Sequence, residues 1–291
     1  MYVITFICNP SNPILSNELV SKYCKAFEGI SVKWLNYGIA ADITIPEIPN
    51  EFKKYWVELQ ARKIDMVIQK EKYRKKRLLV ADMDSTIIEQ ESLDELAYEV
   101  GCGEKISKIT KQAMDGNLEF EDALNRRVDY LKGTPISTIN KVIKNRITLS
   151  PGAKTLISTM QKNNVYSALI SGGFTHFTSK IAQELGFNES KANQFEIINE
   201  KLTGAVISPI LGKEAKVDLI RTLTKKFGLS SIDVIAVGDG ANDIVMLELA
   251  GSGVAMHAKE IVQSKANFII NHSDLSAILY IQGYNFNEFI N

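Results

Sequence analysis

The sequence predicts an α/β fold: a doubly wound parallel sheet, a helical insert in that sheet and a small α+β domain before it. After about residue 150, apolar strands alternate with amphipathic helices, which is typical of a parallel sheet covered by helices. The first strand of the same sheet is expected earlier, at 78–81, and four helical segments separate it from the rest of the alternation. A separate β-α-β-α-β pattern comes first. With 291 residues the chain has room for two domains, which we place at 1–70 and 71–291.

Composition is that of an ordinary soluble protein. Hydrophobic residues make up 45% of the chain and charged residues 23%. With 34 basic and 34 acidic residues the formal net charge is zero, so we expect no nucleic-acid or membrane partner. We find neither a signal peptide nor an apolar run long enough to span a bilayer. Cys8, Cys24 and Cys102 show no paired spacing, which favours a cytoplasmic location.

The first domain is predicted from short apolar runs separated by amphipathic ones. The expected strands are 3–7, 40–45 and 65–68, and the expected helices are 17–27 and 51–61. The pattern resembles an ACT-like module and contains no convergent catalytic set. We therefore expect this domain to serve regulation or to offer a surface for a homodimer. The basic segment 70–77 is interpreted as a solvated linker.

The helical insert lies between a strand at 78–81 and the Pro151-Gly152 break. Its apolar-periodic runs are 93–100, 106–114, 120–131 and 136–147. Glycine follows each of the first three, as is common at helix C-termini. We therefore predict a four-helix cap over about residues 91–149.

The rest of the core follows from its apolar strands and the helices between them. Strands are expected at 165–170 and 234–237, and a hairpin over 195–206 with its turn at 200–204. The expected helices are 154–161, 179–185 and 215–227. Ligands of doubly wound sheets bind outside the carboxyl ends of the strands. The residues just after 81, 170 and 237 should therefore share one pocket.

Polar residues follow each of these three strands. Asp82 and Asp84 come directly after the first, Ser171-Gly172-Gly173 after the second and Gly238–Asp243 after the third. A carboxylate nucleophile beside a carboxylic acid, with backbone N–H groups nearby, suits chemistry on a phosphate. Two acids and an amide in the last segment suggest a hard cation held by oxygens, most simply Mg²⁺. A polar turn with a helix N-cap is the alternative for that segment taken alone.

In order and spacing, these segments resemble the motifs of haloacid dehalogenase-like (HAD) phosphatases. Asp82-Met83-Asp84-Ser85-Thr86 is similar to the first motif, DxDxT, and Ser171, Lys216 and Gly238–Asp243 are similar to the other three. The resemblance is closer still to the phosphoserine phosphatase family and spans about residues 77–284. It implies a Rossmann-like HAD core and hydrolysis of O-phospho-L-serine to L-serine and phosphate, the last step of serine biosynthesis.

The resemblance also implies a role for each matching acid. Asp82 is the nucleophile that forms an aspartyl-phosphate, and Asp84 is the general acid and then the general base. Mg²⁺ is bound by Asp82, by the backbone carbonyl of Asp84 and by Asp239. Asp243 does not bind the metal directly; it acts through a water molecule or by holding the metal ligands in place.

Substrate-binding roles are implied for residues of the core and the cap. Those expected around the phosphate are Ser171, Gly172, Lys216 and Asn242. Glu91 faces the substrate ammonium and Arg127 pairs with its carboxylate, whereas Arg126 should face away. Met114 and Phe120 close over the substrate. Without the resemblance, Glu91 and Arg127 would be interpreted as solvated helix residues.

Alternatives remain for the lysine and for the function. Lys213 competes with Lys216, which we favour because it has the family spacing to Asp239. A HAD phosphatase or phosphotransferase acting on another small phosphorylated metabolite is the second hypothesis. A regulatory binding protein with a degenerate catalytic domain is the third, and the intact set of acids argues against it. Asp84 argues against a true dehalogenase.

Overall fold

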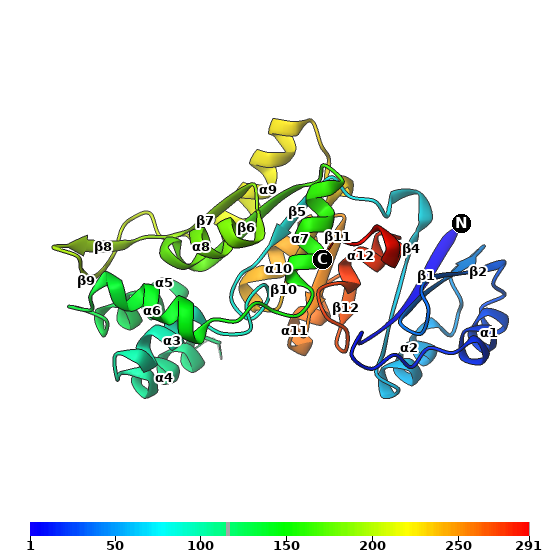
Figure 1. The fold of residues 1–291 in the computed structure, drawn as a ribbon, viewed down its shortest axis with the longest axis horizontal. Coiled ribbons are helices and arrows are strands. Elements are labelled where there is room, and N and C mark those ends of the chain that lie inside the picture. The colour runs from blue at the N-terminus through cyan, green and yellow to red at the C-terminus, as the bar shows by residue number, and fades with distance from the viewer. Residues whose placement is uncertain (115–116, 291) are drawn as a thin grey trace.

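The computed structural model describes residues 1–114 and 117–290. Figure 1 shows three bodies side by side: an amino-terminal sheet with two helices, a central sheet covered by helices, and a helical cap. The side chain of Met114 lies outside the described part of the chain. Within that part, no helix is long and apolar enough to cross a membrane.

The central sheet has six parallel strands in the order β12-β11-β10-β5-β6-β7. They are β5 (Leu78–Ala81), β6 (Tyr166–Phe174), β7 (Glu189–Asn193), β10 (Val234–Gly238), β11 (Ser252–Met256) and β12 (Phe268–Ile270). The chain first extends the sheet on one side of β5 and then on the other. The reversal creates a switch point between β5 and β10, where doubly wound sheets bind ligands. The predicted parallel sheet is confirmed.

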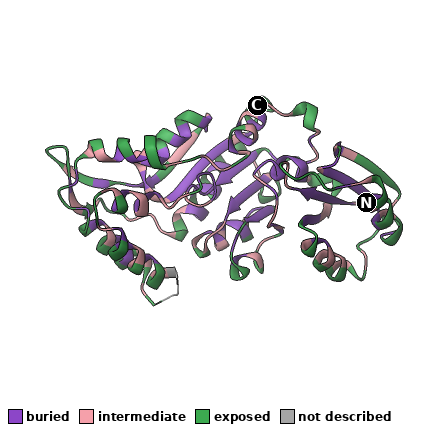
Figure 2. Ribbon diagram, turned by 60° about the horizontal axis from the view of Figure 1, so that its bottom comes forward, coloured by how far each residue is buried: buried purple, intermediate pink, exposed green. Residues whose placement is uncertain are grey.

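Helices cover both faces of this sheet, and its central strands β5, β10 and β11 are buried along their whole length (Figure 2). The flanking helices are α7 (Ala153–Lys162), α8 (Thr175–Leu185), α9 (Lys213–Phe227), α10 (Ile244–Leu249), α11 (Glu260–Gln263) and α12 (Ala277–Ile281), with short 3₁₀ turns η1 (Glu71–Tyr73), η2 (Ser231–Asp233), η3 (Ala241–Asp243) and η4 (Phe286–Glu288). Leu78 and Val80 pack with α9 and α10, whereas Leu79 and Ala81 pack with α7, α8 and α12. Burial on both faces explains why β5 is continuously apolar.

The cap is the predicted four-helix insert between β5 and α7. Its helices are α3 (Ser92–Glu99), α4 (Gly103–Met114), α5 (Phe120–Asp129) and α6 (Ile136–Arg146). The hairpin of β8 (Phe195–Ile198) and β9 (Lys201–Val206) joins it, because Gly133 N donates to Leu202 O at 2.8 Å. The turn lies at Asn199 and Glu200, both with positive φ. The predicted turn, 200–204, was therefore placed too far toward the C-terminus.

The amino-terminal module is an antiparallel sheet in the order β2-β3-β1-β4 with two helices. Its elements are β1 (Tyr2–Cys8), α1 (Asn17–Ala26), β2 (Ser31–Asn36), β3 (Ala40–Ile45), α2 (Phe52–Ala61) and β4 (Ile64–Lys70). This is the β-α-β-β-α-β arrangement of ferredoxin-like folds. The sequence pattern missed β2, since this edge strand is mostly exposed and lacks an apolar run.

The basic segment 70–77 is only in part the solvated linker that its composition predicted: four of its six basic side chains are exposed, but Arg74 and Lys76 are not. Arg74 forms an ion pair with Asp42 at 2.6 Å and donates to the carbonyls of Tyr280 and Ile281. Lys76 is buried and its Nζ donates to Ile232 O at 2.8 Å. Charged side chains in this segment therefore fasten the module to the core.

Asp65 makes a second connection between the module and the core. This fully buried carboxylate on β4 accepts backbone N–H groups of the loop after β12. The donors are Asn271, His272 and Ser273, at 2.9, 3.1 and 2.9 Å. A loop of the core is thus held by a side chain of the module.

Replacing Asp65 with alanine should lower the free energy of unfolding by about 3 kcal/mol, because three backbone N–H groups, one fully buried and two half-buried, lose a charged acceptor. Urea denaturation followed by circular dichroism measures the change. Asp65→Asn, which keeps one acceptor oxygen, should cost less than Asp65→Ala. A loss below about 1 kcal/mol for Asp65→Ala would show that this contact does not stabilise the docked module.

Candidate active site

The carboxyl ends of three neighbouring strands lie level with one another. Ala81 of β5 pairs with Val237 of β10 on one side and with Leu169 of β6 on the other. Asp82 follows one residue later, and Asp239 and Ser171 follow two residues after their paired positions. The register therefore brings the three polar segments to the same edge of the sheet.

A buried lysine links two of the acids. Lys216, which is 2% exposed, lies in the first turn of α9 and donates to Asp82 Oδ1 and, at 2.5 Å, to Asp243 Oδ1. Burial alone would lower the pKa of Lys216, but the two carboxylates raise it above its ordinary value. Lys213 is exposed on the same helix. The geometry therefore favours Lys216 as the lysine of the site.

Burial dominates the electrostatics of the acids. It raises the pKa of Asp82 well above its ordinary value, with Lys216 opposing and the neighbouring acids reinforcing the shift. It also raises the pKa of Asp239 to about 6, against the hydrogen bond that Thr86 Oγ1 donates to Asp239 Oδ1 at 2.8 Å. Lys216 alone thus does not offset the negative charge that gathers here.

The acids could hold a metal ion. One carboxylate oxygen each from Asp82, Asp239 and Asp243 lie within 4.8 Å of one another. Both oxygens of Asp243 already accept hydrogen bonds, from Lys216 at 2.5 Å and from Gly240 N at 3.0 Å. A set of buried carboxylate oxygens fits a hard divalent cation, which would also relieve their mutual repulsion.

Asp84 is held by one donor from the cap and one from the core. Its Oδ1 accepts the backbone N–H of Ser92 at 2.7 Å, and its Oδ2 accepts the Ser171 hydroxyl at 2.7 Å. Ser92 is the first residue of α3, so a cap helix begins on this carboxylate. We expected the Ser171 hydroxyl on a phosphate oxygen; in this structure it donates to Asp84 and accepts Gly173 N.

Glu91 and Arg127 are both half-buried, and each interacts electrostatically with Asp84. Glu91 accepts the Ser85 hydroxyl at 2.8 Å, and burial together with the charge of Asp84 raises its pKa to about 7. Burial lowers the pKa of Arg127, and the charges of Asp94, Glu91 and Asp84 oppose that shift. Arg127 therefore interacts electrostatically with these three acidic residues. Arg126, the preceding residue on the helix, is exposed.

The cap meets the core at Phe120 and Gly172. A Cβ on Gly172 would lie 3.2 Å from Phe120 Cζ, so a larger residue would crowd the ring. The Gly172 carbonyl accepts Asn193 Nδ2 at 2.9 Å. Asn242 lies half-buried in η3, with its side chain against Gly240.

Three residues of the site had no assigned role in the sequence. Thr86 orients Asp239, the N–H of Ser92 holds Asp84, and Asn193 holds the Gly172 carbonyl. Only Thr86 carried a signal, as the last residue of the DxDxT match. The other two contacts depend on how distant segments pack.

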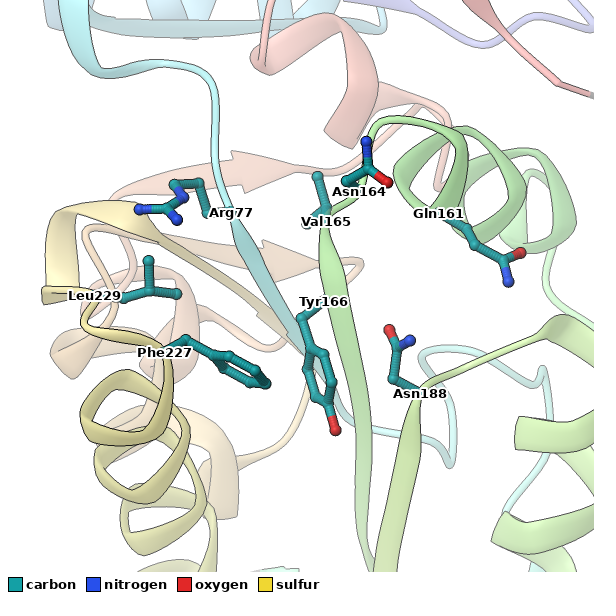
Figure 3. Close-up of a pocket in the computed structure, with 8 residues that line it drawn as sticks. All are labelled: Arg77, Gln161, Asn164, Val165, Tyr166, Asn188, Phe227 and Leu229. Atoms are coloured by element: carbon teal, nitrogen blue, oxygen red, sulfur yellow. The ribbon is translucent and has the colours of Figure 1, made fainter.

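A pocket of about 430 Å³ lies at the opposite end of the sheet (Figure 3). Arg77 and Tyr166, at the amino ends of β5 and β6, line it together with Phe227 of α9. It contains none of the acids described above. The chemistry therefore gathers at the carboxyl edge, away from this pocket.

Known proteins resemble this chain over the core and the cap. The model of haloacid dehalogenase-like hydrolases matches residues 79–248. The phosphoserine phosphatase of Archaeoglobus fulgidus is 42% identical over 202 residues, which span 69% of this chain and 58% of that enzyme. The phosphoserine phosphatase of Methanocaldococcus jannaschii is 41% identical over 206 residues, or 71% of this chain and 97% of that enzyme.

Solved structures extend the likeness to the amino-terminal module. A HAD family hydrolase from Salmonella enterica serovar Typhi matches 97% of this chain and 98% of its own, with a TM-score of 0.84 and 30% identity. A substrate-bound phosphoserine phosphatase complex matches 71% of this chain and 98% of its own, with a TM-score of 0.67 and 41% identity. The chain belongs to the haloacid dehalogenase-like hydrolase family and is similar to phosphoserine phosphatases of that family over its core and cap.

Proposed function

We propose that this chain is a Mg²⁺-dependent phosphoserine phosphatase that hydrolyses O-phospho-L-serine to L-serine and phosphate. The observation that carries the proposal is that Glu91 accepts the hydroxyl of Ser85, the residue after Asp84, and that the charges of Glu91 and Asp84 both act on Arg127. An anion and a cation next to a phosphate-transfer site suit a substrate that carries both an ammonium and a carboxylate. The likeness to a substrate-bound phosphoserine phosphatase, at 41% identity, supports the same conclusion.

Hydrolysis proceeds in two displacements on phosphorus. Asp82 attacks the phosphorus, the bond to the serine oxygen breaks, and Asp84 gives that oxygen its proton. Asp84 then takes a proton from water, which attacks the aspartyl-phosphate and frees both phosphate and Asp82. Lys216 and nearby N–H groups stabilise charge on the transferred group, and the Ser171 hydroxyl joins them by turning its hydrogen from Asp84 to a phosphate oxygen.

Mg²⁺ would be held by Asp82, Asp239 and the backbone carbonyl of Asp84. When bound, it would supply positive charge that lets a phosphate dianion approach these carboxylates. Asp243, whose oxygens are engaged by Lys216 and Gly240 N, supports these ligands from behind.

Removal of divalent cations with a chelator should reduce phosphate release at least about 100-fold, and Mg²⁺ should restore it. The size follows from repulsion of about 4 kcal/mol between unit charges at ~4 Å in an effective dielectric of ~20. Na⁺ at equal ionic strength is the control and should restore nothing. Full activity after dialysis against the chelator would contradict the metal assignment.

Replacing Arg127 with alanine should reduce kcat/KM for phosphoserine by about 100-fold or more, since a charge-assisted pair with the substrate carboxylate is lost. Activity on p-nitrophenyl phosphate, which has no carboxylate, should change less than about 3-fold, within the range of an uninvolved surface substitution. Steady-state phosphate release measures both. Arg126→Ala is the matched control, because Arg126 is exposed on the same helix. Equal losses on the two substrates would remove the assigned role.

The direct test of the proposal is a substrate panel with and without Mg²⁺. It compares phosphoserine, phosphothreonine, sugar phosphates and an aryl phosphate by kcat/KM. Phosphoserine should be preferred. A preference for sugar phosphates would favour the alternative, a HAD phosphatase or phosphotransferase for another metabolite, and would remove the roles of Glu91 and Arg127.

We further propose that the enzyme is cytoplasmic and that its amino-terminal module mediates a homodimer. The exposed edge strand β2, with Val32 40% exposed, supports the module as a contact surface. Light scattering after size-exclusion chromatography measures the mass in solution. A monomer at assay concentration would contradict the dimer.

A further inference from the structure

A hydrogen-bonded chain of three cap side chains ends on Arg127. Each comes from a different helix: Asp94 from the first turn of α3, Thr110 from α4 and Arg127 from α5. Arg127 Nη1 donates to Thr110 Oγ1 at 3.4 Å, and Thr110 Oγ1 donates to Asp94 Oδ1 at 3.2 Å. The guanidinium is thus connected to α4, which packs beside its own helix, and through Thr110 to α3 on the other side of α4.

The three residues also share an electrostatic environment. Thr110 is 9% exposed, and Asp94 and Arg127 are half-buried. Burial raises the pKa of Asp94 and lowers that of Arg127, and each charge opposes the shift of the other. Asp94 is therefore a counter-charge that offsets the cost of burying the Arg127 guanidinium while no substrate carboxylate is bound.

The Thr110 hydroxyl has a single hydrogen, so the partner to which it donates determines whether its oxygen can accept a hydrogen bond from Arg127. The Ile106 carbonyl also lies 3.2 Å from Oγ1, so this hydrogen has two available acceptors. A carboxylate accepts a stronger hydrogen bond than a neutral carbonyl, which favours Asp94. With its hydrogen on Asp94, the hydroxyl presents its oxygen lone pairs to the guanidinium.

Most donors of Arg127 remain for a ligand. Within the described residues, its other hydrogen bond goes from Nε to the Ala123 carbonyl of its own helix, at 3.4 Å. A guanidinium has five N–H donors in a rigid plane. Two of them fix the plane, and a substrate carboxylate can use others.

We propose that Asp94 and Thr110 are positioning residues, which aim Arg127 at the substrate carboxylate and so set the preference for phosphate monoesters that carry one. The inference deepens the proposed function and rests on the role it gives to Arg127. Holding the guanidinium in one orientation reduces the side-chain entropy lost on binding, so the effect appears in substrate affinity.

Thr110→Val keeps the shape of the side chain and removes its oxygen. KM for phosphoserine should rise about 10-fold, the effect of one hydrogen bond to a charged group, while kcat changes less than about 2-fold. Activity on p-nitrophenyl phosphate should stay within about 2-fold. Asp94→Asn should shift KM in the same direction. Ser107→Ala is the matched control on α4, since its hydroxyl contacts Tyr98 Oη at 3.2 Å.

A double-mutant cycle separates positioning from general packing. In an Arg127→Ala background, Thr110→Val should change KM less than about 2-fold, because no guanidinium is left to hold. If the two losses multiply as independent effects, or if Thr110→Val lowers activity on both substrates equally, the positioning role is wrong.

A further readout needs no turnover. Rotation about the Cζ–Nε bond of Arg127, measured by ¹⁵N exchange spectroscopy, should be faster in Thr110→Val and in Asp94→Asn than in the wild type or in Ser107→Ala. Unchanged rotation would overturn the inference. If the wild type does not hydrolyse phosphoserine, the proposed function fails, and this measurement still decides whether Arg127 is held as proposed.

Discussion

Asp82→Asn is expected to abolish phosphoserine hydrolysis, with kcat falling at least about 10³-fold, because an amide cannot form the aspartyl-phosphate. The substitution keeps the size of the side chain. Lys216 keeps Asp243 as its partner, so the fold should persist. Phosphate release measures the loss, and intact mass excludes conversion of the new asparagine back to aspartate.

The control for this substitution is Asp218→Asn. Asp218 lies on α9 with a side chain 67% exposed, and its nearest cation is Arg221 at 3.9 Å. Its removal should leave kcat unchanged. If Asp82→Asn retained activity within about tenfold of the wild type, Asp82 would not be the nucleophile.

Lys216→Met should both destabilise the protein and inactivate it. The variant leaves Asp82 and Asp243, 5% and 0% exposed, without their shared cation. Removing one partner of a buried ion pair costs about 3–5 kcal/mol, and the remaining like charges repel. Urea denaturation should show a loss of that size, and phosphate release should fall at least about 100-fold, as when one stabilising contact of a transition state is removed.

Lys213→Met provides the matched control, one turn earlier on the same helix. Lys213 is exposed, so its removal should change the free energy of unfolding by less than about 0.5 kcal/mol. Similar effects of the two substitutions would contradict the assignment of Lys216. Loss of activity without loss of stability would show that the two carboxylates find another partner.

The parts of the fold that the sequence predicted are those with strong local patterns. Strand β5 is a continuous apolar run, and the parallel-sheet rule then brings Asp82, Ser171 and Asp239 to one edge. Strand β7 was missed because Glu189–Asn193 is largely polar, and β12 because it has only three residues. Both strands are defined by pairing with neighbours rather than by their own composition.

Contacts between segments far apart in the chain could not be predicted from the sequence patterns. Arg74 and Lys76 belong to a basic run that looks solvated, yet their partners Asp42 and Ile232 are brought close only by the fold. The hydrogen bond from Thr110 to Asp94 likewise depends on how α3 and α4 pack. The motifs predicted which acids gather at the carboxyl edge of the sheet, but not which neighbours hold them in place.

The central claim is that phosphoserine transfers its phosphate to Asp82. Brief incubation of the wild-type chain with ³²P-labelled phosphoserine and Mg²⁺, followed by an acid quench and peptide mapping, tests it most directly. The label should be hydroxylamine-sensitive and should lie on the peptide that contains Asp82. A label on another residue would contradict the account, as would turnover of phosphoserine without any trapped phosphoenzyme.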